Sequence, residues 1–78
     1  MESDYKEKRR LIKLALKVSY YRRLAALSVP ALADLAKVSV STIQKLESPT
    51  NPRPVSLTTL WIISDVLGVH ISKLFLDD

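Results

Sequence analysis

The chain has 78 residues, of which 47% are hydrophobic and 26% charged, with a net charge of +4 and no cysteine. These values are typical of one small globular domain, and they exclude a disulfide framework and any metal site built on thiolates. No apolar stretch approaches the ~18 residues of a membrane-spanning helix, so we expect a soluble, cytoplasmic protein.

The positive charge is concentrated near the N-terminus. Residues 1–23 contain eight basic and three acidic side chains, a net charge of +5, whereas residues 24–78 contain four basic and five acidic ones, a net charge of −1. A basic segment of this kind is either a solvated helix or a contact surface for the phosphates of a nucleic acid. The charge pattern alone leaves both interpretations open.

Apolar residues recur at helical spacing, and strand-type alternation is absent from the sequence, so we predict an all-α fold. We expect Leu32, Ala33, Leu35 and Ala36 of the second helix and Leu57, Leu60, Ile63 and Leu67 of the fourth to face the core. Residues 1–13 would form a basic N-terminal extension of the first helix. The five expected helices cover about residues 3–27, 29–37, 40–47, 57–67 and 71–76.

Capping residues mark several of these helix ends. Ser39 and Ser56 each precede a helical pattern and are good N-cap residues. Gly68, the only glycine, suits the C′ position after the fourth helix. Residues 48–55 contain three prolines, which predicts a rigid loop. We therefore expect a single domain over residues 1–78, with a helix pair at 29–47, this loop, and two more helices at 56–76.

The third predicted helix has two different faces. With about 100° of rotation per residue, Ile43 and Leu46 point to one side and are expected to face the core. The outer side carries short or hydrogen-bonding side chains. Such a strip is narrow enough for a DNA major groove, where Gln, Ser and Lys bind base edges and phosphates, although it also fits a solvated helix face. The strip consists of Val40, Ser41, Gln44, Lys45 and Ser48.

Two stretches of the sequence, ALSVPALADLAKVSVSTIQKLE and SLTTLWIISDVLGVHISKLF, resemble a known family. In register, they are similar to the helix-turn-helix domains of phage repressors and Cro proteins, the lambda repressor-like or xenobiotic-response-element type. The resemblance covers about residues 18–76. The matching positions are Leu27, Ser28, Leu32, Ala33, Ala36, Val38, Ser39, Ser41, Thr42, Ile43 and Glu47 in the first stretch, and Ser56, Leu57, Thr59, Leu60, Ile63, Leu67, Gly68, Val69, Leu74 and Phe75 in the second.

The resemblance implies a compact five-helix domain that binds double-stranded DNA, with the third helix in the major groove. It also implies an ion pair between Arg22 and Glu47 that joins the first helix to the third. The implied base-contacting residues are Val40, Ser41, Gln44 and Lys45, and the implied phosphate-side positions are Val29, Ser39 and Thr42. We expect Arg22 or Arg23, together with the basic first helix, to supply further phosphate contacts.

The chain departs from the family pattern at several positions. Where the family usually has a polar residue, often Gln, this chain has Val29 and Val40. Val29 cannot form a side-chain bond to a phosphate, and Val40 can offer only an apolar contact, for example to a thymine methyl group. Lys37 replaces the family's turn glycine, which implies strain if φ is positive there. The loop before the fourth helix is about two residues longer than usual.

Apolar residues on the expected outer side of the fourth helix predict a contact with another protein chain. Helix 4, helix 5 and the tail commonly form dimer interfaces in the family, so we expect a homodimer. The residues expected in that interface are Trp61, Ile62, Val66 and Leu76.

The sequence therefore predicts a transcription regulator, a repressor, that binds double-stranded DNA as a homodimer and is associated with the nucleoid. No cofactor, metal or membrane partner is expected. The alternative is a protein-interaction module on the same scaffold, such as an antitoxin or a regulator that binds a protein partner. An enzyme is not expected, because the sequence shows no nucleophile–base set and no Gly-rich phosphate loop. The only histidine, His70, is expected to be a capping or surface residue.

Overall fold

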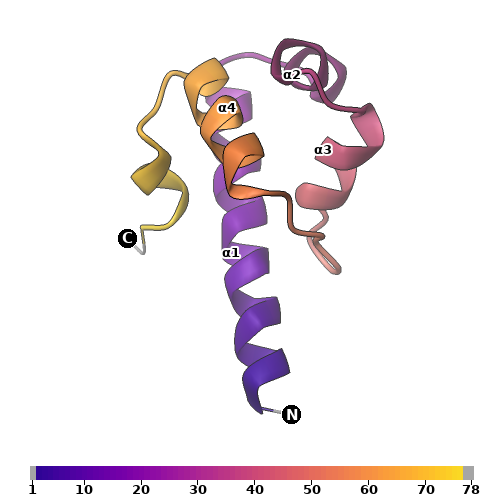
Figure 1. The fold of residues 1–78 in the computed structure, drawn as a ribbon, viewed down its shortest axis with the longest axis vertical. Helices are drawn as coiled ribbons and strands as arrows, with labels where there is room; N and C mark the ends of the chain where they lie inside the picture. Colours follow the sequence, from indigo (N-terminus) through magenta and orange to yellow (C-terminus); the bar gives the residue numbers. More distant parts are fainter. Residues whose placement is uncertain (1, 77–78) are drawn as a thin grey trace.

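The computed structural model describes residues 2–76, with the side chains of residues 5–76 (Figure 1). No strand occurs in residues 2–76, which confirms the predicted all-α class for that range. The elements are four α-helices, α1 (Glu2–Leu24), α2 (Val29–Ala36), α3 (Val40–Leu46) and α4 (Leu57–Leu67), and a short 3-10 helix, η1 (Ile71–Leu74).

The fifth predicted helix, over about residues 71–76, is a 3-10 helix that covers only Ile71–Leu74, so the prediction of five α-helices is not confirmed. The Lys73 N–H donates to the His70 carbonyl oxygen at 2.9 Å, and the Phe75 N–H donates to that of Ser72 at 3.0 Å. Both bonds connect residues three apart, which is the pattern of a 3-10 helix rather than an α-helix. The segment is therefore a short turn that ends the described chain beside α1.

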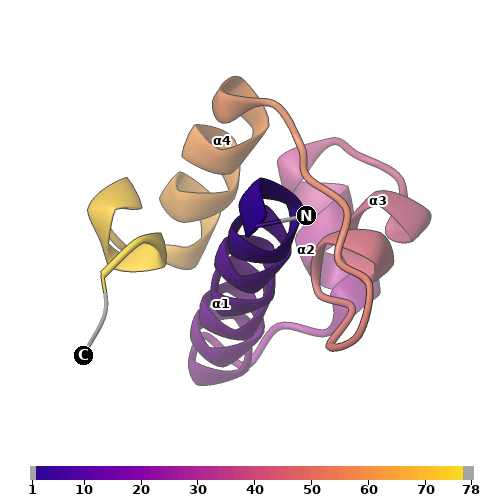
Figure 2. The same ribbon diagram turned by 90° about the horizontal axis from the view of Figure 1, so that it is seen from below.

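The core lies where the C-terminal half of α1 meets the other elements, and the N-terminal half of α1 projects beyond them (Figure 1). Seen from below, α4, η1 and the α2–α3 pair lie around α1 and leave its remaining side uncovered (Figure 2). The largest fully buried apolar side chains come from all five elements: Val18, Leu32, Ile43, Leu46, Ile63 and Leu74.

Two residues predicted to face the core lie outside it. Leu35 is 52% exposed and Leu57 is 55% exposed. α2 buries only a narrow stripe, Leu32, Ala33 and Ala36, and Leu35 lies on its other side. Leu57 is the first residue of α4, directly after the loop of residues 48–55 and the capping residue Ser56. Both positions fit a helical period, but neither has a neighbouring element that covers it.

Serine side chains begin three of the α-helices, as the sequence predicts for Ser39 and Ser56. Ser28 accepts the Ala31 N–H, Ser39 the Thr42 N–H and Ser56 the Thr59 N–H, each at 3.1 Å. Each bond satisfies one of the N–H groups that an α-helix leaves without an intrahelical partner at its start.

Left-handed residues end α1, α2 and α4. Gly68, after α4, has φ +73°, but Ala26 and Lys37 also have positive φ values, 59° and 61°. α1 consequently ends at Leu24, about three residues earlier than predicted. The turn at Ala26 directs Leu27, which packs against the core, toward the start of α2. No glycine marks this end, so the local sequence carries no signal for the left-handed turn at Ala26.

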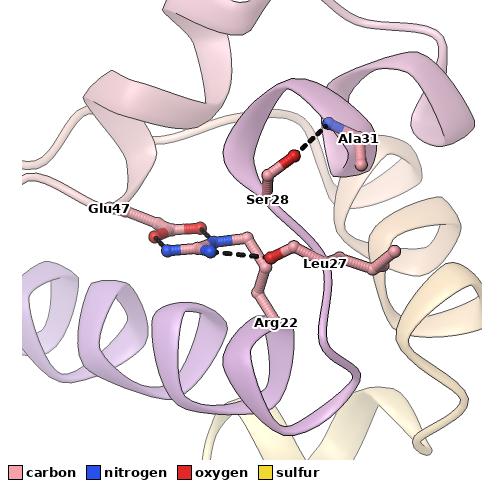
Figure 3. Close-up of polar contacts among 5 residues, drawn as sticks. All are labelled: Arg22, Leu27, Ser28, Ala31 and Glu47. Atoms are coloured by element: carbon pink, nitrogen blue, oxygen red, sulfur yellow. Dashed lines mark hydrogen bonds and ion pairs between the residues drawn. The ribbon is translucent and has the colours of Figure 1, made fainter.

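The Arg22–Glu47 ion pair joins the end of α1 to the residue that ends α3 (Figure 3). Arg22 Nε donates to Glu47 Oε2 at 2.8 Å and Nη2 donates to Oε1 at 2.9 Å. Nη1 donates to the carbonyl oxygen of Leu27 at 2.8 Å. Only 11% of the Arg22 side chain and 8% of the Glu47 side chain are exposed. One guanidinium group therefore connects α1, the α1–α2 connection and the end of α3.

Hydrogen bonding to Glu47 raises the pKa of the Arg22 guanidinium, against the opposing effect of burial. A raised pKa in the folded state means that folding favours the charged form. The stabilisation that comes from the ionisation of Arg22 is therefore complete below the ordinary pKa of arginine, and it is lost as the pH rises through the raised pKa of the folded state.

Replacing Arg22 with alanine is expected to lower the free energy of unfolding by about 3–5 kcal/mol, because the Glu47 carboxylate would remain buried without its partner. Urea denaturation followed by circular dichroism measures the change. Arg23→Ala is the matched control, since Arg23 is exposed, and should change the value by less than about 0.5 kcal/mol. Equal losses in the two variants would contradict the structural role of the pair.

Replacing Ala26 with glycine is expected to raise the free energy of unfolding by about 1 kcal/mol, because glycine adopts positive φ without steric cost. Gly68→Ala is the reciprocal variant. An added Cβ would meet no atom within 4 Å, so its expected loss of about 1 kcal/mol comes from the backbone alone. Urea denaturation measures both, and a change of the same sign in both variants would contradict this explanation.

Candidate nucleic-acid interface

α3 holds the predicted outer strip away from the core. Ile43 and Leu46 are 0% and 1% exposed, and they fix the inner face of this seven-residue helix. The outer face carries the four residues that the sequence assigns to base contact, and all of them are exposed: Val40, Ser41, Gln44 and Lys45.

A tight turn sets the orientation of α3 against α2. The Lys37 N–H donates to the Asp34 carbonyl oxygen at 3.2 Å, and the Val38 N–H donates to that of Ala33 at 3.0 Å. Ala33 is 1% exposed, which shows why a small residue is needed there. Lys37 has φ 61°, a positive value for which strain is expected in a residue other than glycine. The two helices thus form a helix-turn-helix whose second member presents its outer face to solvent.

The loop after α3 extends the outer strip. A shallow hollow is lined by residues of α3, Ser41, Gln44 and Lys45, and by residues that follow it, Ser48, Asn51 and Arg53. The Arg53 N–H donates to the Lys45 carbonyl oxygen at 2.9 Å, which holds the loop against the C-terminal end of α3. Pro52, next to Arg53, is buried. Two cationic side chains and no carboxylate line this hollow.

Asn51 and Arg53 are candidate site residues that sequence reasoning missed. The sequence shows a polar amide and a cation between prolines in a loop that is longer than usual. It does not show that the loop folds back onto α3. That arrangement depends on the Arg53–Lys45 backbone bond and on the burial of Pro52.

The residues predicted to contact phosphates differ in whether their side chains are available for such a contact. Ser39 and Thr42 lie at the start of α3, where their hydroxyl groups are 2.8 Å apart, and Arg23 is exposed at the end of α1. Arg22 does not fit the phosphate role, because its guanidinium is nearly buried and bonded to Glu47 and Leu27. Val29 packs partly against the core, so only its backbone remains for a polar contact.

The residues predicted to form a dimer interface do not all lie together. Trp61 and Ile62 on α4 are 50% and 40% exposed, whereas Val66 is half-buried against the core. Leu76 is 51% exposed, and it lines a hollow with α1 residues such as Leu14 and Lys17 rather than with α4 residues.

His70 is a capping residue, as predicted. Its Nδ1 atom accepts the Ser72 N–H at 3.1 Å and caps η1. Within residues 5–76, no group of three or more His, Asp or Glu side chains could hold a metal ion. No helix in the described part of the chain is long and apolar enough to cross a membrane.

The family model of helix-turn-helix domains matches residues 18–74, most of the chain. No curated protein and no solved structure matches the chain. The matched region contains the C-terminal part of α1 and all of α2, α3, α4 and η1. The chain therefore belongs to the Cro/C1-type helix-turn-helix family, the family of DNA-binding domains found in transcription regulators.

Proposed function

We propose that the protein reads a specific sequence in double-stranded DNA by placing α3 in the major groove, and thereby regulates transcription. The observation that carries the proposal is the exposed strip on α3, opposite a face that is almost completely buried. A short helix fixed in this way has one free surface, and that surface consists of side chains suited to base edges.

The chemistry of each side chain assigns it a base contact. The Gln44 amide can bond both N6 and N7 of an adenine, and the Lys45 ammonium can bond O6 and N7 of a guanine. Ser41 can donate to or accept from either kind of base. Val40 supplies an apolar contact for a thymine methyl group. Gln44 and Lys45 would therefore provide most of the discrimination between sites.

The phosphate contacts would come from both sides of α3. Arg23 and Arg53 are exposed cations, and the Ser39 and Thr42 hydroxyl groups lie at the helix start. Val29 would contribute its backbone N–H at the start of α2. Such contacts fix the orientation of a protein on the duplex and supply affinity without reading the sequence.

Binding as a homodimer would place two copies of α3 about 34 Å apart, one turn of the duplex, on a partly palindromic site. Trp61 and Ile62 are the residues best placed to begin that interface, because they are large apolar side chains exposed on α4. Occupancy of a promoter site is sufficient for repression, and the protein would be associated with the nucleoid.

A second candidate function is a protein-interaction module, antitoxin-like or partner-binding, with little DNA reading. The same exposed Trp61 and Ile62 favour it, together with the apolar Val40, the first residue of α3, among the residues proposed to contact bases. The salt dependence of DNA affinity separates the two candidates. A protein that makes several contacts with DNA phosphates loses affinity steeply as the salt concentration rises. The DNA affinity of a protein without such contacts depends very little on salt.

Selection of the full chain against a random pool of duplex DNA is expected to enrich a site with two half-sites about ten base pairs apart. Lys45→Ala should then weaken binding to that site by about 5- to 150-fold, the equivalent of ~1–3 kcal/mol, and weaken binding to unrelated DNA much less. Lys73→Ala in η1 is the control. A folded protein that enriches no site would contradict sequence reading.

Replacing Trp61 and Ile62 together with serine is expected to shift the protein from dimer to monomer, because the apolar area that drives association is removed. Sedimentation velocity on the full chain measures the change. Leu35→Ser is the control, since Leu35 is an apolar residue of similar exposure that lies on α2 and not on α4. A monomer before substitution, or a dimer that persists after it, would contradict this interface.

A further inference from the structure

α1 carries a second apolar surface on the side that faces away from the core. Leu16, Tyr20 and Leu24 are 58%, 58% and 67% exposed, and they follow Ile12 at intervals of four residues. Tyr5, 65% exposed, extends the same surface toward the N-terminus. These five residues are called the α1 stripe below. α1 has a side that no other element in residues 2–76 covers (Figure 2).

The α1 stripe has the form of a helix-packing surface rather than a solvated one. The core side of α1 is already supplied by Leu14, Ala15 and Val18, which are 7%, 1% and 0% exposed. A helix with one such face normally carries polar residues on the other. Apolar side chains four residues apart form a continuous ridge, and ridges of this kind fit into the grooves of a second helix.

Two hollows lie along the α1 stripe and provide places for the side chains of a partner. The first is lined by Tyr5 and Ile12 together with the basic residues Lys8, Arg9 and Lys13. The second is lined by Leu16, Ser19, Tyr20, Arg23 and Leu24 of α1 and by Glu47 and Pro49, which follow α3. Glu47 and Pro49 thus form a wall beside the C-terminal half of the stripe.

The surroundings of the α1 stripe are positively charged. Within residues 5–24, the only acidic residue is Glu7, and it lines a different hollow with Leu11 and Pro54. The carboxylate of Glu47 is bonded to Arg22. A partner therefore meets apolar side chains flanked by cations, with no unpaired acidic side chain among the described residues of the two hollows.

We propose that the α1 stripe binds an acidic amphipathic α-helix of a partner protein, with apolar residues at four-residue intervals and Asp or Glu beside them. A second copy of this chain is disfavoured as the occupant, because it would bring two positive faces together. A flat lipid surface could not follow the stripe past the wall formed by Glu47 and Pro49. The side chains of a helix can enter the two hollows, and its acidic flanks match the surrounding cations.

The proposed contact lies apart from the face of α3 that is proposed to read bases. The hollow beside α3 shares no residue with the two hollows along the α1 stripe. The stripe also begins before residue 18, outside the part of the chain that the family model matches. The residues proposed to contact bases are thus absent from both hollows along the stripe, and Arg23, which lines the second hollow and is also a proposed phosphate contact, is the residue that the two interactions share.

The test is a selection of displayed helical peptides of roughly 20 residues, about the length of α1, with one face randomised and the full chain as bait. Acidic peptides with apolar residues at four-residue intervals should be enriched. In fluorescence anisotropy, Leu16→Ser with Leu24→Ser should weaken binding of a selected peptide by about tenfold or more. Leu35→Ser on α2 is the matched control and should have little effect, and added salt should weaken binding.

Three outcomes would overturn the proposal. The first is no enrichment of acidic peptides, or selected peptides that bind the doubly substituted chain as well as the original. The second is stripe-dependent binding to phosphatidylglycerol vesicles without peptide enrichment, which would assign the stripe to lipid. The third is a dimer that becomes a monomer on the same double substitution, which would assign it to a second copy. Circular dichroism checks that both exposed-site variants remain folded.

Discussion

The Arg22 guanidinium lies at the point on which the rest of the structure depends. It connects α1 to the end of α3 through Glu47 and to the α1–α2 connection through the Leu27 carbonyl. Two nearly buried charges are tolerated only when geometry and hydrogen bonding are close to ideal, because desolvation otherwise exceeds their attraction. The pair therefore fixes one orientation of α3 against α1. The same bonds take Arg22 out of the set of phosphate contacts and make it a positioning residue.

α3 is too short to be stable alone, since isolated helices of fewer than about 12 residues are marginal in water. Its order comes from its surroundings. Ser39 satisfies an N–H at its start, the Arg53 N–H satisfies a carbonyl near its end, and Ile43 and Leu46 are buried below it. Every support acts on the ends or on the inner face. The outer face is therefore held rigid although none of these supports contacts it. A surface that reads base edges has to be both rigid and free in this way.

The molecule carries three chemically different surfaces on three helices. The α3 strip is polar and lies beside the cations of the loop, α4 exposes Trp61 and Ile62, and the α1 stripe is apolar between basic residues. A domain of this size buries only part of its apolar residues, and contiguous exposed ones mark contact sites. These surfaces lie on different elements, so the contacts proposed with DNA, with a second copy and with a partner helix would use different helices.

The sequence by itself determined the features that depend on neighbouring residues. The serine caps, the end of α4 at Gly68 and the two faces of α3 follow from preferences within a few positions, and the family resemblance predicted the Arg22–Glu47 pair. Only the tertiary structure decided that α1 ends at Leu24, that Leu35 and Leu57 remain exposed, that residues 71–74 form a 3-10 turn, and that Asn51 and Arg53 lie beside α3. The exposure of Leu35 and Leu57 depends on whether another element covers them, and the positions of the helix ends and of the loop depend on backbone bonds that the apolar periodicity does not encode.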